Sequence, residues 1–108
     1  MRSRGRQIRM VQGDTVQYDI SVLYGSDHVE YELMEGDILR FRMKKYLYDK
    51  EPIIEKQISA MDPILDISPE DTISCMPGEY HYNIDLLTTE GDIYTIVPDS
   101  LFIIIPKV

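Results

Sequence analysis

The segment 77–86 constrains the fold of this chain more than any other. After a Pro77-Gly78 turn, aromatic and aliphatic side chains alternate with polar ones. The first set is Tyr80, Tyr82, Ile84 and Leu86, and the second is Glu79, His81, Asn83 and Asp85. Successive side chains of a strand point to opposite faces, so the pattern predicts a strand with one dry and one wet face. We therefore expect a sheet that covers a core on one side only.

The first tyrosine of this strand also favours a particular kind of sandwich. Immunoglobulin-like domains carry a tyrosine near the start of their sixth strand, two residues before the second cysteine of antibody domains. Tyr80 occupies that place, and Tyr82 stands where the cysteine would be. The strand thus indicates a fold, although it does not specify a chemistry.

Period-two alternation recurs along the rest of the chain. The predicted strands cover residues 7–12, 15–23, 29–33, 38–46, 53–59, 79–87, 93–97 and 101–105. Pro98 is expected to separate the last two, and Ser68-Pro69-Glu70-Asp71 is typical of a turn or one helical turn. Short strands with turn signals about every 8–12 residues predict an all-β fold, an immunoglobulin-like antiparallel β-sandwich of about 7–9 strands.

Chain length and strand pattern together predict the domain organisation and the core. At 108 residues there is room for one domain, with residues 1–12 as a basic arm or edge strand and 13–108 as the sandwich. The dry faces supply the expected core: Val16, Tyr18, Ile20, Val22, Leu39, Phe41, Met43, Tyr80, Tyr82, Ile84, Leu86, Phe102 and Ile104.

Charge and cysteine content limit the function classes. The net charge is −8, yet four arginines precede the first acidic residue, Asp14. An acidic body argues against nucleic-acid binding and favours basic partners. Cys75 is the only cysteine, which suits folding in a reducing cytoplasm. No apolar run approaches the roughly 20 residues of a membrane span, and the first residues lack the apolar stretch of a secretory signal.

The residues that could carry chemistry do not form a known constellation. Cys75 and His81 lie on either side of the Pro-Gly turn without an evident third group, so an inert thiol and a solvated histidine are the favoured interpretation. The acids at Asp62, Asp66, Glu70 and Asp71 form either a calcium-binding loop or a solvated edge. We expect no enzyme activity, no cofactor and no metal.

Three surfaces are candidates for protein contacts. The arginine-rich start is either a free tail or an arm that orders against a partner, and the outward row of predicted strand 38–46 either docks an acidic group or stays solvated. The last strand is apolar on both faces, so either a loop of this chain or another chain covers it. The candidate contact residues are Arg2, Arg4, Arg6, Arg9, Arg40, Arg42, Lys44, Leu101, Phe102 and Ile103.

The order of segments over residues 11–105 resembles a known family. Gly13-Asp14-Thr15 opens the first long strand, residues 39–45 alternate apolar and basic side chains, and Pro69-Glu70-Asp71-Thr72 forms a turn. Gly78-x-Tyr80-x-Tyr82-x-Ile84 and the Thr95-Ile96 hairpin arm follow. This arrangement is similar to the N-terminal domain of phage baseplate upper proteins (BppU-type) and of small prophage structural proteins.

The resemblance implies a function by contact. Such domains are immunoglobulin-like sandwiches that anchor to other virion proteins in a tail, baseplate, neck or capsid surface, assembled in the bacterial host cytoplasm as oligomers. The chain lacks the long C-terminal extension of the baseplate type, so an adsorption arm fits less well than a free-standing virion component. The alternative is a carbohydrate- or surface-binding sandwich in which Tyr24, Tyr46 and Tyr48 stack on sugars.

Overall fold

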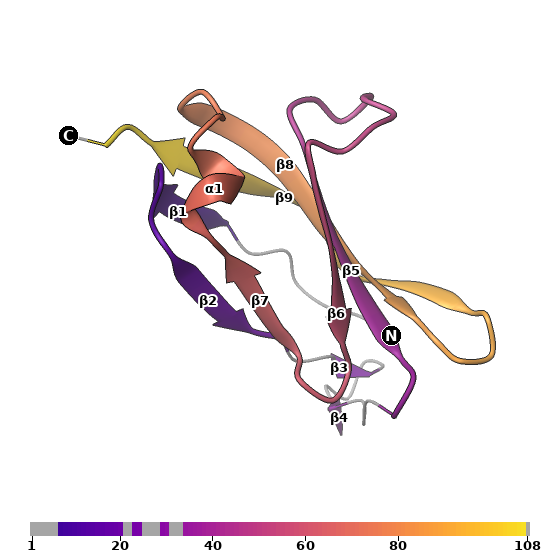
Figure 1. Cartoon of the computed structure of the whole chain (residues 1–108). Helices are drawn as coiled ribbons and strands as arrows, with labels where there is room; N and C mark the ends of the chain where they lie inside the picture. The colour runs from indigo at the N-terminus through magenta and orange to yellow at the C-terminus, as the bar shows by residue number, and fades with distance from the viewer. Residues whose placement is uncertain (1–6, 21–22, 25–28, 31–33, 108) are drawn as a thin grey trace.

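The computed structural model describes residues 7–20, 23–24, 29–30 and 34–107, and its regular structure is mostly β (Figure 1). Within these residues, a single short helix interrupts the strands. In chain order the elements are β1 (Ile8–Val11), β2 (Val16–Asp19), β3 (Leu23–Tyr24), β4 (Val29–Glu30), β5 (Ile38–Lys44), β6 (Ile54–Ser59), β7 (Ile64–Ile67), α1 (Pro69–Thr72), β8 (Gly78–Leu87) and β9 (Ile93–Ile105).

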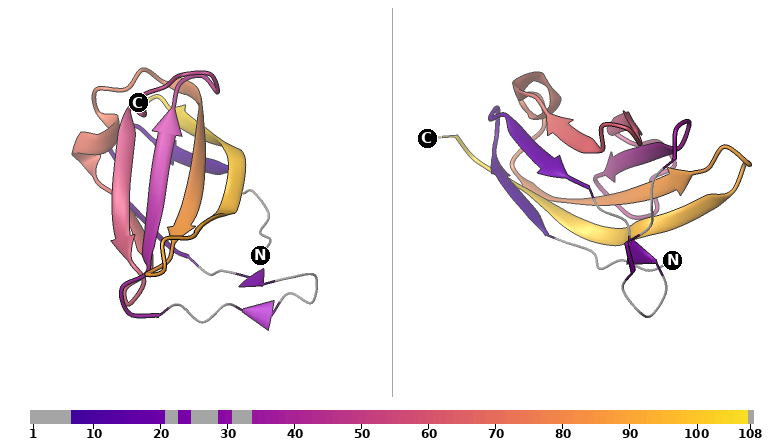
Figure 2. Two further views of the ribbon diagram at one scale, coloured as in Figure 1. Left: turned by 90° about the vertical axis from the view of Figure 1, so that its right-hand side faces the viewer. Right: turned by 90° about the horizontal axis from the view of Figure 1, so that it is seen from below.

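A curled five-stranded sheet forms the larger layer, in the order β1-β9-β8-β5-β6. Its pairs are antiparallel except that β1 runs parallel to β9. The second layer is the antiparallel pair β2-β7, which lies over the concave side of the large sheet (Figure 2). The predicted all-β sandwich-like fold is confirmed, with one parallel pair in a sheet that we expected to be wholly antiparallel.

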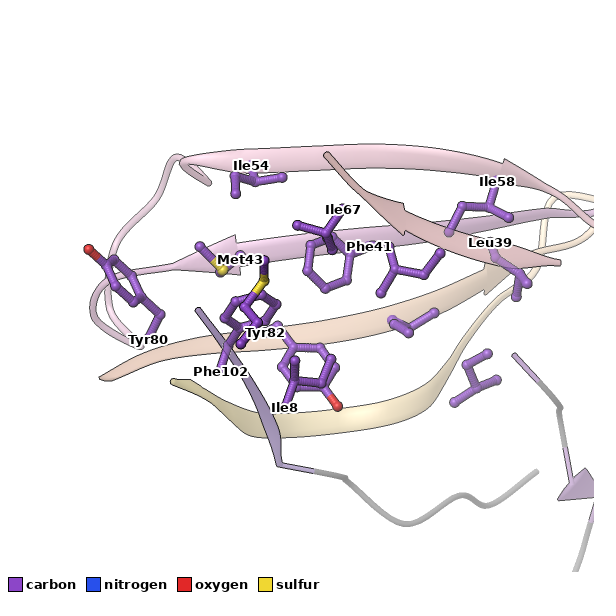
Figure 3. Close-up of a cluster of buried hydrophobic side chains, with 14 of the residues drawn as sticks. Ile8, Leu39, Phe41, Met43, Ile54, Ile58, Ile67, Tyr80, Tyr82 and Phe102 are labelled. Carbon is purple, nitrogen blue, oxygen red and sulfur yellow. The ribbon is translucent and has the colours of Figure 1, made fainter. Parts of the chain in front are cut away.

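The core lies between the two layers, and the predicted alternation places it there. Phe41, Tyr82 and Phe102 come from three neighbouring strands and contact one another through their rings, with centroids 5.6–6.4 Å apart (Figure 3). Leu65 and Ile67 of β7 close over them and are fully buried. At the border of this core, the predicted core residues Val16, Tyr18 and Ile20 are half-buried. Val22 lies outside the described residues.

Tyr80 adopts the geometry that its position predicts. Its ring is buried, and its hydroxyl donates a hydrogen bond to the carbonyl of Met76, four residues upstream, at 2.6 Å. This backward bond from the start of a strand is the tyrosine corner of immunoglobulin-like sandwiches. Burial raises the pKa of the Tyr80 hydroxyl, so it stays protonated and keeps donating. The bond ties the loop that enters β8 to the sheet.

The helix begins as the sequence predicts and joins the layers at one end. Pro69 occupies its first turn, and the Asp71 carboxylate accepts hydrogen bonds from the Ser68 backbone N–H at 2.8 Å and the Ser68 hydroxyl at 3.0 Å. The same carboxylate pairs with Lys56 of β6 at 2.8 Å. Lys56 lies directly opposite Phe41 in the β5-β6 register, so this charge reaches inward from an edge strand.

The prediction that Pro98 separates two strands is wrong, because β9 runs without a break from Ile93 to Ile105. The register against β8 shifts between Tyr82 and Ile84 and again between Ile84 and Asp85. Such bulges hold an extra residue out of the ladder, and a proline that cannot donate is tolerated there. β9 is therefore part of the sandwich over its C-terminal half and part of a hairpin with β8 over its N-terminal half. The hairpin extends past the end of the sandwich (Figure 1).

Candidate contact surface

The outer face of the large sheet carries most of the predicted contact residues. In the β5-β8 register, Arg40 pairs with Asp85, and Lys44 pairs with His81. Paired residues of antiparallel strands point to the same face, so the basic row and the polar row of β8 lie side by side. The outward direction of the basic row is confirmed by the half-buried positions that it occupies between buried neighbours.

Two of the three basic residues are not free charges. Arg40 Nη2 lies 3.0 Å and Arg42 Nη2 lies 3.2 Å from the same oxygen of Asp85. We predicted that Asp85 faces water, but it is only 5% exposed because the two guanidinium groups cover it. The patch thus consists of a closed ion network at Arg40 and Arg42, and Lys44 is left as the basic residue of the row that makes no ion pair within the described part of the chain.

Lys44 lies at a small hollow of about 60 Å³ on this outer face. The hollow is also lined by Arg42, Leu47, His81, Tyr82, Asn83 and Asp99. The His81 Nδ1 atom is 3.2 Å from an Asp99 oxygen, a distance at which the two attract when the ring is protonated, although the angle does not make a hydrogen bond. Arg42 Nε and Asn83 Oδ1 are buried without a hydrogen-bond partner among the described residues, and such groups cost free energy.

The last strand supplies an apolar part of the same face. Leu101 and Ile103 point outward and are half-buried, and exposed Arg9 of β1 lies beside Ile103 in the parallel register. Phe102 points inward and is completely buried, so its side chain belongs to the core and is removed from the contact set. The remaining arm residues of the prediction, Arg2, Arg4 and Arg6, lie outside the described residues.

Sequence reasoning did not include the β5-β6 loop among the protein contacts, yet it is the most exposed apolar segment of the structure. Tyr48 is 82% exposed, Leu47 is 59% exposed, and Tyr46 and Ile53 are each 50% exposed. The rings of Tyr46 and Tyr48 stack on each other at 5.5 Å and 6°. The run Tyr46-Leu47-Tyr48 was a usable signal. It joins the end of the predicted strand 38–46 to the loop that follows, and three consecutive large side chains there cannot all face one core. We call residues 46–53 the tip.

Cys75 and His81 have separate surroundings. The Cys75 thiol donates a weak hydrogen bond to the Asp71 carbonyl at 3.5 Å, while His81 faces Asp99. Burial, and secondarily the Asp71 charge, raises the pKa of the Cys75 thiol, which disfavours the thiolate that a nucleophile requires. His81 is therefore not placed to act as a base for this thiol.

The acidic segment 62–71 is distributed rather than gathered. Asp71 is engaged by Lys56 and Ser68, whereas Asp62, Asp66 and Glu70 are exposed. In the part of the chain that the structure describes, no three His, Cys, Asp or Glu side chains are placed to hold a metal ion. Across the same residues, no helix has the length and apolar content needed to cross a bilayer.

Comparisons with models of protein families, with curated proteins and with solved structures found no match to this chain.

Proposed function

We propose that this chain is a non-enzymatic structural protein of a phage or prophage particle, which acts by binding other particle proteins. The observation that carries the proposal is the exposure of large apolar side chains at the tip of a domain whose core is complete without them. When a partner covers exposed apolar groups on one loop, the free energy of the complex falls because apolar surface leaves water. The setting in a virion rests on the segment order that resembles baseplate upper proteins.

The outer face adds a second surface of the right kind. Leu101 and Ile103 form an apolar strip beside the charged residues of β5 and β8, and interfaces combine an apolar centre with a polar rim. The ion network around Asp85 holds Arg40 and Arg42 in fixed positions before a partner arrives. Groups held in place in this way lose less conformational entropy on binding.

Fractionation of particles tests this function. Particles from the bacterium that carries the gene are separated on a density gradient, and the protein is followed with an antibody. We expect it in the fractions of assembled particles or tails. Recovery of all the protein in the soluble fractions, with particles present elsewhere in the gradient, would contradict the proposal.

The basic arm supplies a more specific version of this test. We expect the variant Arg2→Ser, Arg4→Ser, Arg6→Ser and Arg9→Ser to fold normally and to enter particles several-fold less. Circular dichroism checks the fold, and the gradient measures incorporation. Normal incorporation of the serine variant would remove the arm from the contact set while leaving the particle assignment in place.

The exposed Tyr46-Tyr48 pair favours one alternative, a carbohydrate- or surface-binding module. Aromatic faces stack on sugar rings, and Tyr48 presents most of its surface to solvent. The chain has eight tyrosines and no tryptophan, so glycan titration can be followed by tyrosine fluorescence. A saturable change that Tyr48→Ala abolishes supports this alternative, and an unchanged spectrum supports assembly.

A further inference from the structure

We propose that copies of this chain associate head to tail, with the β8-β9 hairpin of one copy bound at the hollow and tip of the next. The proposal rests on the proposed function, because it names one partner of an assembly protein, a second copy. The β8-β9 hairpin and the β5-β6 loop lie at opposite ends of a body with extents of 42 × 26 × 25 Å, as Figures 1 and 2 show.

The hairpin end is acidic, ordered and partly apolar. Its turn is held by hydrogen bonds from the Thr88 N–H to the Asp92 carbonyl at 2.9 Å and from the Gly91 N–H to the Thr88 carbonyl at 3.1 Å. Glu90 and Asp92 are exposed and make no ion pair among the described residues. Ile93 follows at once and is 60% exposed.

The opposite end presents the complementary chemistry. Lys44 lines the hollow without an ion pair within the described part of the chain, and Leu47 belongs both to the hollow and to the tip. Asp99 lines the hollow beside His81, and the tip holds Lys50 between Asp49 and Glu51. Lys44 is the charge of the hollow that an incoming carboxylate can approach. A hollow of about 60 Å³ has room for one acidic side chain, and the tip offers apolar surface to Ile93.

The unpaired carboxylates and Ile93 of the hairpin thus match Lys44 and the apolar tip of the next copy. Two hairpins would bring like charges together, which costs affinity. A contact between different surfaces of identical chains is heterologous, so it produces rings or filaments rather than a closed pair. Open growth of this kind suits a repeated part of a particle.

β6 and the uncovered part of β9 carry features that disfavour the competing edge-to-edge contact. β6 places Lys56 on the inner face of an edge strand, and β9 has Pro98 and two register shifts where β1 no longer pairs with it. Inward charges, prolines and bulges are the devices by which sheets block strand addition.

Charge reversal at each end, followed by mixing, tests the proposal. One variant is Lys44→Glu, and the other combines Glu90→Lys with Asp92→Lys. Sedimentation velocity over a concentration series at low salt should show that each variant alone associates about tenfold or more weakly than the wild-type chain. An equimolar mixture should regain association, because the reversed hairpin meets the reversed hollow and the two unchanged surfaces still fit each other.

Matched controls separate this contact from bulk charge. Asp14→Lys with Asp66→Lys makes the same charge change as the hairpin variant at exposed positions away from both ends, and Lys107→Glu matches the hollow variant. We expect both controls to associate as wild type does, and circular dichroism and thermal unfolding confirm that all the variants are folded.

Three outcomes would overturn the inference: a wild-type chain that stays monomeric at every concentration, weakened association in only one of the two variants, or a mixture that does not recover. None of them bears on particle fractionation, so failure here is distinguishable from failure of the proposed function.

Discussion

The two faces of the large sheet are built from the same strands but are stabilised differently. On the inner face of β5 and β8, Phe41 and Tyr82 pack as rings that exclude water. On the outer face of the same strands, Arg40 and Arg42 enclose Asp85 by charge. The inner contacts are non-directional and depend on area, while the outer contacts depend on the position of a single carboxylate. The inner face therefore carries the fold, and the outer face is available for contacts.

Removing the central ring of the inner face should have the largest effect. Phe41→Ala deletes a fully buried ring that contacts Tyr82 and Phe102, so we expect a loss of about 3–5 kcal/mol in the free energy of unfolding. Urea titration followed by circular dichroism measures it. A loss below about 1 kcal/mol would mean that the inner face does not dominate stability.

Breaking the outer network should cost less. Asp85→Asn leaves two guanidinium groups without their charge partner, and we expect a loss of about 1–3 kcal/mol. Replacing Arg40, Arg42 and Asp85 together by leucine should restore most of it, because the uncompensated charges disappear with the carboxylate. If the triple variant is less stable than Asp85→Asn, the network contributes more than the cost of its own desolvation.

A smaller effect is expected at Tyr80, where the inner face carries a polar group. Tyr80→Phe keeps the buried ring and removes the hydrogen bond to the Met76 carbonyl, so unfolding free energy should fall by about 0.5–1.5 kcal/mol. Hydrogen exchange should show faster opening of the amides that enter β8. An unchanged free energy together with unchanged exchange would show that ring burial alone holds this loop.

The smallest effect concerns Asp71, whose partner Lys56 is the inward charge of the edge strand. Burial alone would raise the pKa of Asp71, but hydrogen bonds from Lys56 and Ser68 outweigh it and hold the pKa below its ordinary value of 3.8. The carboxylate therefore adds stability above pH 3.8, and this contribution is lost as the pH falls through the lowered value. Asp71→Asn should lose about 1 kcal/mol or less at pH 6, since the pair is partly solvated.

Denaturant titrations of the wild-type and Asn variant chains along a pH series measure this difference. We expect it to shrink below pH 3.8 and to vanish in strong acid. A difference that persists at low pH would assign the effect to packing and not to charge.

Local sequence patterns predicted much of the fold. The alternation at Tyr80, Tyr82 and Ile84 placed these side chains in the core, where the structure has them. Ser68 and Pro69 predicted the one helical turn. These features depend on neighbours in sequence, and the tyrosine corner links only Tyr80 and Met76, so a linear reading contains the information.

Pairing between distant segments could not be predicted in the same way. Arg40 and Asp85 are far apart in sequence, and only the β5-β8 register makes them an ion pair. The same limit explains the missed parallel pairing of β1 with β9 and the bulges that carry β9 past Pro98. The hollow at Lys44 combines residues of β5, β8 and β9, so no single segment signals it.

The sequence by itself determined which side chains face inward, because alternation is a property of one strand and needs no partner. The tertiary structure decided which charges remain free, because neutralisation depends on strands brought together from distant parts of the chain. Arg42 and Lys44 occupy equivalent positions in sequence, and only the placement of Asp85 beside the first separates their roles.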